Sequence, residues 1–386
     1  MNFIPYGKQC INKDDIELVC EVLNSDWLTQ GPLIERFEKA LAKYCGAKYA
    51  VAVSNGTVAL HLACRVIGVE KNDEVITTPI TFVSSSNCVL YCDGRPVFAD
   101  IDPRTLNINP NRIKEKITDK TKAIIPVHFR GEPCDMESIY EIVKANNLFI
   151  IEDAAHALGS KFKNQKIGNC KYSDMAIFSF HPVKHITTGE GGAITTNNKD
   201  LYEKLLLLRT HGITKAKSLF KNKDSGPWYY EMQDLGFNYR ITDIQCALGV
   251  SQLKKLDTFI KRRREIVDIY NKAFSNVEWI QTLIEGENSY NSYHLYVALF
   301  DFDYIKKTRK EVFEILYKNN IGAQVHYIPV HLQPYYKKNL DYKYGDYPEA
   351  EAYYEKAISL PLYPKMNDDD VYYVIENVLK LDNKGL

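Results

Sequence analysis

One lysine of the sequence stands where amine chemistry is expected. Lys184 lies in SFHPVKHITTGEGGAITT, between two apolar runs that predict strands. Ligands of open α/β sheets bind at strand ends, and burial among the neighbouring histidines and glycines would help the amine lose its proton. A neutral amine condenses with a carbonyl group to form an imine. Taken alone, however, a loop lysine is more often simply exposed to solvent.

An aspartate at the end of an apolar run is the second candidate. Asp153 ends LFIIED, where a carboxylate is costly unless a cation faces it. A protonated pyridine nitrogen is such a cation, and an aspartate that keeps the proton there makes the ring a better electron acceptor. The alternative, an aspartate that caps the next helix, is about as common for this segment alone.

A short turn, SNGT over 54–57, is the third candidate. It joins the apolar run KYAVAVS to a helical pattern, and the free N–H groups and dipole of a helix start bind anions. Gly56 allows close approach, Thr57 follows it, and Ser179 offers a hydroxyl to the same phosphate. An ordinary capped turn has the same residues. We call this turn at 54–57 the phosphate cradle. Together, however, the cradle, Asp153 and a lysine about thirty residues after that aspartate predict a phosphorylated pyridine cofactor.

The pattern of apolar runs predicts the elements that must hold these residues. Between residues 48 and 196, runs rich in Val and Ile alternate with helical patterns, including helices near 57–67 and 81–91. Such runs are typical of a mostly parallel sheet covered on both faces. Pro32 and Gly46 bracket a further helix expected to pack on this sheet. We therefore expect an α/β/α sandwich.

A change of pattern after residue 240 predicts a second domain. A long charged helical segment, expected to break near Lys254, precedes the strand-like run SYHLYVALF, a helix around 307–317, a tyrosine-rich stretch and a last helix from Asp368. The 386 residues exceed what a single core usually supports. We expect a large cofactor-binding domain over 1–250 and a smaller C-terminal α+β domain over 251–386.

Composition excludes several classes of protein. Forty-nine basic residues balance forty-nine acidic ones, so the overall attraction of a nucleic-acid or membrane-surface binder is missing. The N-terminus has no signal pattern, and no uncharged apolar run reaches membrane-spanning length. The nine scattered cysteines predict reduced, mostly buried thiols. We expect a cytoplasmic protein without metal, nucleic acid or membrane partners.

Several motifs, taken in order over essentially the whole chain, resemble those of the DegT/DnrJ/EryC1/StrS sugar aminotransferases. They are WLTQGP at 27–32, SNGT, TTPITFVSSSN at 77–87, EDAAHALG at 152–159, SFHPVKHITTGEGG and LGFNYRITDIQCALG at 235–249. The resemblance implies the type I pyridoxal-phosphate-dependent aminotransferase fold and pyridoxal 5'-phosphate as the cofactor.

Within the family, three segments are most similar to the transaminases of pseudaminic acid biosynthesis. These segments are SFHPVKHITTGEGG, YEMQDLGFNYR and HYIPVHLQPYY. That branch implies L-glutamate as the amino donor and a UDP-linked 4-keto-6-deoxy sugar as the acceptor. The implied product is UDP-4-amino-4,6-dideoxy-N-acetyl-β-L-altrosamine.

The resemblance also implies roles around the cofactor. Lys184 is the implied Schiff-base lysine and proton shuttle, and Asp153 the implied partner of the pyridine nitrogen. His156 stands beside the cofactor ring, and Phe82 is a candidate to cover the ring face. A helix-start histidine and an ordinary core phenylalanine are the alternatives for these two. The implied phosphate ligands are Gly56, Thr57 and Ser179.

Further residues are implied in subunit contact and substrate binding. Asn238 corresponds to an asparagine that reaches the phosphate of the neighbouring subunit, with Arg240 close to the substrate, which implies a homodimer with shared active sites. A loop that caps the next helix is the alternative. His326, Tyr327 and His331 are candidates for the sugar-nucleotide pocket, although the tyrosine-rich stretch is equally suited to packing between domains.

Other functions remain open from the sequence. The chain fits an aminotransferase for another nucleotide-linked 4-keto or 3-keto sugar. Relatives that act as sugar dehydratases carry histidine at the lysine position, whereas this chain has Lys184 with His185 beside it. A non-catalytic sensor has no need of lysine, aspartate and phosphate cradle together, so their joint presence favours catalysis.

Overall fold

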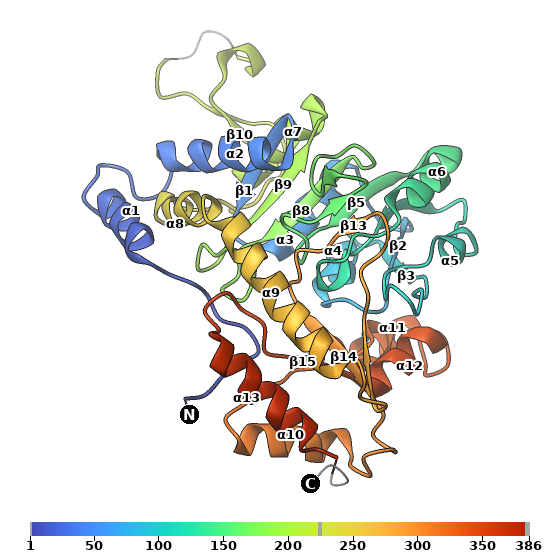
Figure 1. The fold of residues 1–386 in the computed structure, drawn as a ribbon. Helices are drawn as coiled ribbons and strands as arrows, with labels where there is room; N and C mark the ends of the chain where they lie inside the picture. The colour runs from blue at the N-terminus through green and yellow to red at the C-terminus, as the bar shows by residue number, and fades with distance from the viewer. Residues whose placement is uncertain (1, 223–225, 383–386) are drawn as a thin grey trace.

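A seven-stranded sheet lies at the centre of the computed structural model, which describes residues 2–222 and 226–382 (Figure 1). Its strand order is β1-β9-β8-β5-β4-β2-β3. Among the described residues, β9 alone runs antiparallel to its neighbours, so the predicted mostly parallel sheet is confirmed. The strands are β1 (Tyr49–Val53), β2 (Glu74–Thr77), β3 (Arg95–Phe98), β4 (Thr121–Ile125), β5 (Phe149–Asp153), β8 (Met175–Ser179) and β9 (Gly192–Thr196).

Helices cover both faces of this sheet. Successive side chains of a strand point to opposite faces, so Ala50 and Ala52 of β1 enter one core cluster while Val51 and Val53 enter another. Helices α2 (Pro32–Cys45), α6 (Met136–Asn146) and α8 (Asp243–Leu253) pack in the first cluster. Helices α3 (Gly56–Val66), α4 (Ser84–Leu90) and α7 (Lys199–Arg209) pack in the second. The predicted sandwich is confirmed.

Most helix ends agree with the sequence patterns. Gly46 ends α2 in the left-handed region at φ 83, which glycine adopts without strain. The charged segment breaks after Leu253 and resumes as α9 (Leu256–Phe274). Helix α4 is shorter than the predicted 81–91, because residues 81–83 form a loop before Ser84. The remaining N-terminal helices are α1 (Lys13–Leu23) and α5 (Pro110–Lys114).

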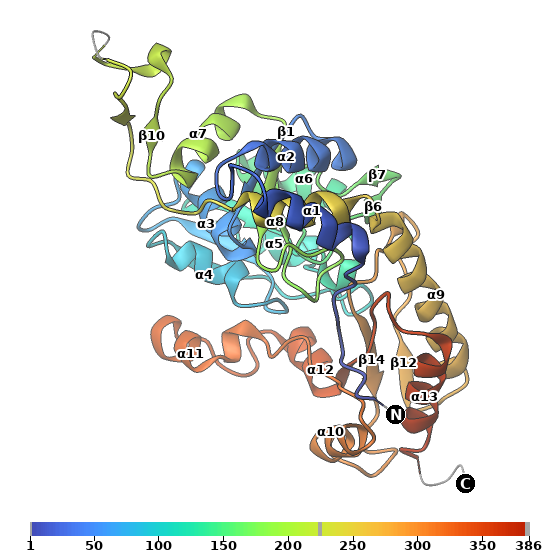
Figure 2. The ribbon, with the colours of Figure 1, turned by 90° about the vertical axis from the view of Figure 1, so that its left-hand side faces the viewer.

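The C-terminal part has a core of its own. Its three-stranded antiparallel sheet has the order β12 (Ile280–Thr282), β14 (Tyr296–Phe300), β15 (Ala357–Leu360). Helices α9, α10 (Arg309–Lys318) and α13 (Asp368–Leu379) share one hydrophobic cluster with it. Ile4 joins the same cluster, so the N-terminal segment lies with this part of the chain (Figure 2). Helices α11 (Pro334–Leu340) and α12 (Pro348–Lys356) lie beside it, and the boundary at residue 250 stays a prediction.

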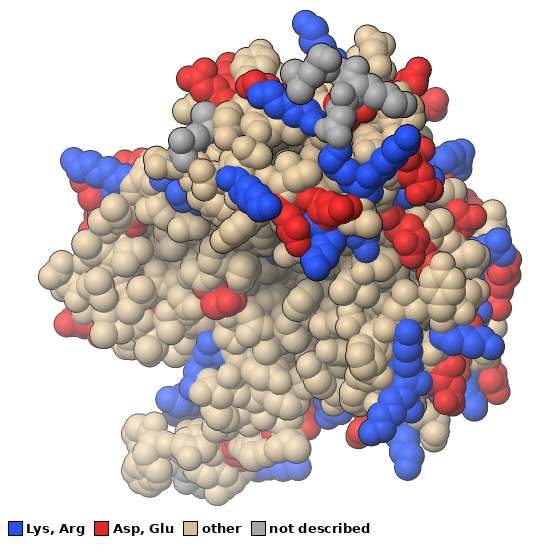
Figure 3. Space-filling model, turned by 90° about the horizontal axis from the view of Figure 1, so that it is seen from below, with Lys and Arg blue, Asp and Glu red and all other residues tan. Residues whose placement is uncertain are grey.

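An arm projects from the sheet domain (Figure 2). It contains β10 (Ile213–Thr214), the short helix η2 (Lys217–Leu219) and β11 (Glu231–Met232). Phe220 of the arm is buried, but four other large apolar side chains are exposed: Leu219, Trp228, Tyr230 and Met232. On the face seen from below, positive and negative side chains are intermixed and wide areas are uncharged (Figure 3).

The remaining elements are short. A second small sheet joins β13 (Ser289–Tyr290), β6 (Lys161–Phe162) and β7 (Gln165–Lys166), and the 3-10 helices η1 (Phe129–Gly131) and η3 (Val330–Leu332) lie in loops. All nine cysteines are free and seven are buried, as predicted. Within the described part of the chain, we find no helix with the length and hydropathy needed to cross a membrane.

Candidate active site

A cavity of about 820 Å³ opens at the carboxyl ends of β1, β5 and β8. This is the edge where ligands bind in open α/β sheets. The sequence-predicted residues that line it are Gly56, Thr57, Phe82, Asp153, His156, Ser179, Lys184, His326 and Tyr327. A second hollow of about 710 Å³, between α5 and α6, contains none of the predicted residues. The topology therefore gathers most of the candidates into one place.

The start of α3 forms one end of this cavity. Asn55 caps the helix by accepting a hydrogen bond from the Val58 N–H at 3.0 Å. The N–H groups of Gly56 and Thr57 have no acceptor within the helix, because of their position in its first turn. A Cβ atom at Gly56 would lie 3.0 Å from the Ser179 Cβ. Glycine thus lets the free N–H groups and the Ser179 hydroxyl converge, an arrangement suited to a phosphate.

Asp153 supplies a buried carboxylate to the cavity. Its Oδ2 accepts a hydrogen bond from the Ser85 hydroxyl at 2.6 Å, and its Oδ1 accepts one from the Ala155 N–H at 3.1 Å. Burial raises the pKa of this carboxyl group, against the hydrogen bonds and the charge of Lys184. No helix begins directly after Asp153. Asp153 therefore does not cap a helix, and a cation in the cavity would stabilise its charged form.

Lys184 lies half-buried in the cavity wall. Its Nζ lies 3.4 Å from Nε2 of His294. Burial lowers the pKa of this amine to about 8, against the attraction of Asp153. A sizeable fraction of the amine is therefore neutral near pH 8. His185, the next residue, does not line the cavity, and its Nε2 lies 3.2 Å from the Ser292 carbonyl oxygen instead.

Three aromatic residues of the cavity lining, His156, Tyr327 and Phe82, stand close together. Nε2 of His156 lies 3.1 Å from the Tyr327 hydroxyl, while Nδ1 of His156 is buried without a partner among the described residues. Burial and the charge of Lys184 hold the pKa of His156 well below its usual value, so the ring is neutral. Phe82 is 56% exposed and its ring lies 6.3 Å from that of Tyr327, so it is not an ordinary core residue.

The two C-terminal histidine candidates have different environments. His326 lines the cavity, and its Nδ1 lies 2.8 Å from the Ser359 hydroxyl. His331 is fully buried outside the cavity lining, with its Nε2 2.8 Å from Oε1 of Glu351. The structure does not bring His331 to the cavity, because η3 turns its side chain toward α12. This is the packing role that the sequence left open for the tyrosine-rich stretch.

Asn238 and Arg240 do not line the cavity of their own chain. Asn238 forms an isolated β-bridge with Thr210. Between the two, the Tyr239 carbonyl oxygen accepts a hydrogen bond from the Ser54 N–H at 2.9 Å. The segment therefore adjoins the phosphate end of the cavity while Asn238 remains on the surface.

The comparison with protein families decides the class of the protein. The model of the DegT/DnrJ/EryC1/StrS aminotransferase family matches residues 9–379. The chain belongs to this family. It is 44% identical to the spore coat polysaccharide biosynthesis protein SpsC of Bacillus subtilis, over 98% of this chain and 96% of the relative.

Two further relatives of the family have named activities. The GDP-perosamine synthase of Escherichia coli O157:H7 is 37% identical over 98% of both chains. The UDP-4-amino-4,6-dideoxy-N-acetyl-beta-L-altrosamine transaminase of Campylobacter jejuni (strain 81-176) is 38% identical over 99% of this chain and 98% of the relative.

Solved structures of aminotransferases share the whole fold. Helicobacter pylori PseC, an aminotransferase of pseudoaminic acid biosynthesis, superposes with a TM-score of 0.92 at 34% identity and covers 99% of this chain and 100% of its own. The PLP-form of the putative sugar aminotransferase Spr1654 of Streptococcus pneumoniae gives 0.91 at 32% identity, over all of both chains. The predicted fold class and family are confirmed, and the cofactor of this sugar aminotransferase family is pyridoxal phosphate.

The cavity of this DegT-family chain fits that cofactor. Free helix N–H groups suit its phosphate, and the Asp153 carboxylate suits its protonated ring nitrogen. The Lys184 amine lines the same cavity and contacts His294. Each group is present on an element that the sheet holds in place. The chemistry of the lining residues therefore fits the phosphate, the ring nitrogen and the aldehyde of this cofactor.

The sequence interpretation missed two residues that contact these groups. Ser85 donates to Asp153 from the first turn of α4; it lies within the TTPITFVSSSN motif but was itself given no role. His294 reaches Lys184 from the run SYHLYVALF, which was interpreted only as a strand. A histidine in an otherwise apolar strand pattern is the signal that could have identified it.

Proposed function

We propose that the chain transfers the amino group of L-glutamate to C4 of a UDP-linked 4-keto-6-deoxy-N-acetylhexosamine. The product would be UDP-4-amino-4,6-dideoxy-N-acetyl-β-L-altrosamine, as in pseudaminic acid biosynthesis. The observation that carries the proposal is the joint placement of Lys184, Asp153 and the helix-start cradle around one cavity. The similarity to the Campylobacter transaminase and to Helicobacter PseC supports this choice of sugar.

When bound, pyridoxal phosphate supplies an aldehyde that condenses with amines and a protonated ring that accepts electrons. Gly56, Thr57 and Ser179 would hold its phosphate at the start of α3, and the Asp153 carboxylate would keep the proton on its ring nitrogen. Phe82, exposed at the cavity, is placed to cover one face of the ring and exclude water.

Lys184 performs the proton transfers in this proposal. Its neutral Nζ takes the proton from the α-carbon of glutamate in the first half of the cycle. In the second half, the same Nζ returns a proton to C4 of the sugar, so that one amine acts as both base and acid. The lowered pKa, about 8, suits both tasks near neutral pH, because neither protonation state is rare.

The orientation of two neighbouring residues favours transfer over elimination. Relatives that act as dehydratases have histidine in place of the lysine. Here Lys184 lines the cavity, whereas His185 is turned away from it toward the Ser292 carbonyl. An amine is thus available to shuttle protons. A sensor without catalysis would not need this amine beside Asp153 and the cradle.

We also propose a homodimer with shared active sites. A UDP-linked sugar has two negative charges on its diphosphate, yet Lys184 is the one Lys or Arg among the described residues that line the cavity. Arg240 and Asn238 stand on the adjoining surface, available to the cavity of a second subunit. The exposed apolar side chains of the arm would be covered in such a dimer. Mass measurement in solution tests this directly.

The substrate is tested with a panel of keto-sugars. Purified enzyme with glutamate and UDP-, GDP- or dTDP-linked 4-keto sugars should form an amino-sugar and 2-oxoglutarate, identified by NMR and mass. The UDP-linked sugar is expected to react fastest, and a GDP-linked sugar is the second candidate because of the similarity to GDP-perosamine synthase. Ammonia release without an amino-sugar would refute transfer in favour of elimination.

A further inference from the structure

His294 lies behind the cavity lining in contact with Lys184, although no family motif in this sequence contains it. Its Nε2 atom lies 3.4 Å from Lys184 Nζ, and this is the polar contact that the lysine side chain makes among the described residues. The chain reaches this point 110 residues after the lysine. The contact therefore arises only when the strand β14 segment packs against the end of the large sheet.

The imidazole of His294 is neutral in this setting. It is buried, and the titratable or charged groups around it are Lys184, His156, His185 and Arg263. Burial and these potential cations hold the pKa of His294 well below its usual value. A neutral ring has one nitrogen with a free electron pair. Because the ammonium form of Lys184 can only donate, Nε2, which faces it, carries the electron pair that accepts its hydrogen bond.

The backbone of His294 is held from both sides. Its N–H donates to the Arg130 carbonyl oxygen at 3.0 Å. Its own carbonyl oxygen accepts from Nη1 of Arg263 at 3.2 Å, and the same guanidinium reaches the Tyr293 carbonyl at 3.3 Å. Arg263 is fully buried, and burial lowers its pKa to about 10. Burying an arginine to bind carbonyl groups is costly, so the position of this backbone is strongly specified.

Two residues with strained backbone conformations lie next to the His294 backbone: Tyr293 precedes it in the chain, and Arg130 accepts its N–H hydrogen bond. Arg130 has φ 54 and Tyr293 has φ 50, in the left-handed region that side-chain-bearing residues avoid. Such strain persists only where surrounding contacts enforce it, and it gathers at functional sites. Here the Tyr293 N–H donates to Oδ1 of Asn291 at 2.7 Å. The conformation just before His294 is thus enforced by a buried side chain.

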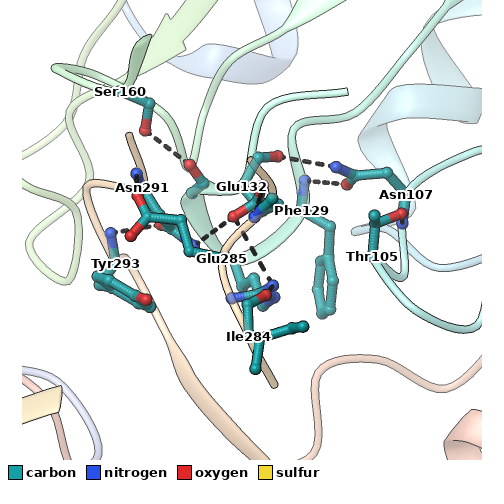
Figure 4. Close-up of polar contacts among 12 residues, drawn as sticks. Thr105, Asn107, Phe129, Glu132, Ser160, Ile284, Glu285, Asn291 and Tyr293 are labelled. Atoms are coloured by element: carbon teal, nitrogen blue, oxygen red, sulfur yellow. Dashed lines mark hydrogen bonds and ion pairs between the residues drawn. The ribbon is translucent and has the colours of Figure 1, made fainter. Parts of the chain in front are cut away.

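A buried polar network supports this conformation (Figure 4). Nδ2 of Asn291 donates to Oε2 of Glu132 at 3.1 Å. The Ser160 hydroxyl donates to the Gly131 carbonyl oxygen at 2.6 Å. A Cβ atom at Gly131 would lie 2.6 Å from Oδ1 of Asn291, so glycine is needed for the two loops to meet. The network joins the loop after β4 to the segment that presents His294.

The imidazole plane is also packed in place. The ring of His156 lies 4.3 Å from it and that of His185 lies 5.6 Å away, centroid to centroid. With backbone and ring both fixed, the Nε2 electron pair has one direction in which to accept a hydrogen bond. That direction leads to the Lys184 amine.

We propose that His294 is a positioning residue for Lys184, whose Nε2 accepts a hydrogen bond from the lysine and holds the free amine at the cavity wall between its two proton transfers. This inference rests on the proposed role of Lys184. It explains why a neutral histidine, rather than a carboxylate, stands there: a carboxylate would pair with the ammonium and keep it protonated.

Two nearly isosteric variants separate positioning from packing. His294→Gln keeps a polar atom near the place of Nε2, whereas His294→Asn keeps one near the place of Nδ1. His294→Leu removes both. The first readout is the pKa of Lys184 in the cofactor-free full-length protein, from the pH dependence of carbamylation by cyanate, followed by mass spectrometry of the Lys184 peptide. Circular dichroism checks that each variant is folded.

Loss of the acceptor should lower the pKa of Lys184 by about one unit in the Leu and Asn variants, because a hydrogen bond to the ammonium stabilises its charged form. Gln should retain the wild-type value. In the enzyme with bound pyridoxal phosphate, the single-turnover rate with glutamate should fall about tenfold in His294→Leu and His294→Asn. The glutamate concentration at half-saturation should not change. His294→Gln should keep most of the wild-type rate.

Three outcomes would overturn the inference. An unchanged Lys184 titration in the Leu and Asn variants would show that Nε2 does not bind the amine. Equal losses in the Gln and Asn variants would show that His294 acts through packing alone. A shift in the glutamate half-saturation at an unchanged rate would place its role in donor binding. Failure of the proposed function is a separate result: Lys184→Ala would then still form the cofactor imine, whatever His294 does.

Discussion

The two ends of the cavity consist of different chemical groups. At the phosphate end, backbone N–H groups at the start of α3 converge with Ser179, and Gly56 makes the approach possible. At the lysine end, titratable side chains meet: Lys184, Asp153 and the neutral histidines. Fixed backbone dipoles bind an anion without changing charge, whereas side chains with shifted pKa values can move protons. In the proposed function, phosphate binding and proton transfer would therefore use different groups of the cavity.

The largest effect should follow removal of the amine at the lysine end. Lys184→Ala should reduce transamination by on the order of 10⁴, because it removes the one amine among the described residues that line the cavity. The absorption band of the lysine imine should disappear while the protein stays folded. Steady-state kinetics and absorption spectra measure both. Retained transamination would refute the assignment of Lys184.

Removal of the charge on Asp153 should have the next largest effect. Asp153→Asn keeps the size of the side chain and its neighbours Ser85 and Ala155. The rate should nevertheless fall about 100-fold, since a neutral amide does not keep the proton on the ring nitrogen. Ser85→Ala, which removes one hydrogen bond to the carboxylate, serves as the milder control. Equal losses in the two variants would show that geometry, not charge, matters here.

The lysine end should respond to pH. With a pKa of about 8, Lys184 is mostly protonated below that pH and mostly neutral above it. The rate at which cofactor-free protein forms the imine with added pyridoxal phosphate should therefore rise about twentyfold between pH 6.5 and 8.5 and then level off. Stopped-flow absorbance measures it. A rise that continues to pH 10 would show that burial does not lower this pKa.

A smaller effect is expected from crowding the phosphate end. Gly56→Ala places a Cβ atom 3.0 Å from the Ser179 Cβ, so the helix start or the strand end must shift. The affinity for pyridoxal phosphate should fall about tenfold, from loss of roughly one hydrogen bond to a charged group. In contrast with the lysine end, this loss should be equal at pH 7 and pH 9. Equilibrium dialysis measures the affinity. A pH-dependent loss would show that the phosphate end does not differ from the lysine end in this respect.

The smallest effect is expected from the hydroxyl at the same end. Ser179→Ala removes one donor without adding atoms, so about 1 kcal/mol, roughly a fivefold loss of cofactor affinity, is expected. The rate at saturating cofactor should remain close to that of the wild type. A large fall in rate would show that Ser179 acts on the reaction and not only on the phosphate.

The phosphate end and Asp153 were predictable because their signals are local. A helix start after one strand and an aspartate at the end of another are readable in short segments, and parallel strands bring their carboxyl ends to one edge of the sheet. The same reasoning placed Lys184 after β8. The structure agrees with each of these positions.

Other positions depended on packing that short segments do not encode. His326 and His331 are five residues apart, yet one lines the cavity and the other pairs with Glu351 in the core. The difference arises because His331 lies in the 3-10 helix η3, which turns its side chain toward Glu351. Asn238 lies beside the cradle but outside the cavity of its own chain. Their environments depend on how the C-terminal part and the surface loops dock.

The sequence by itself indicated the family through the resemblance of its motifs. It also determined the sandwich and the residues at the strand ends, because apolar periodicity and helix starts are set by neighbours along the chain. Only the tertiary structure decided that His294 meets Lys184 and that His185 turns away from the cavity. Contacts between residues about a hundred positions apart are set by the docking of separate elements, and side-chain direction at such contacts is decided by packing.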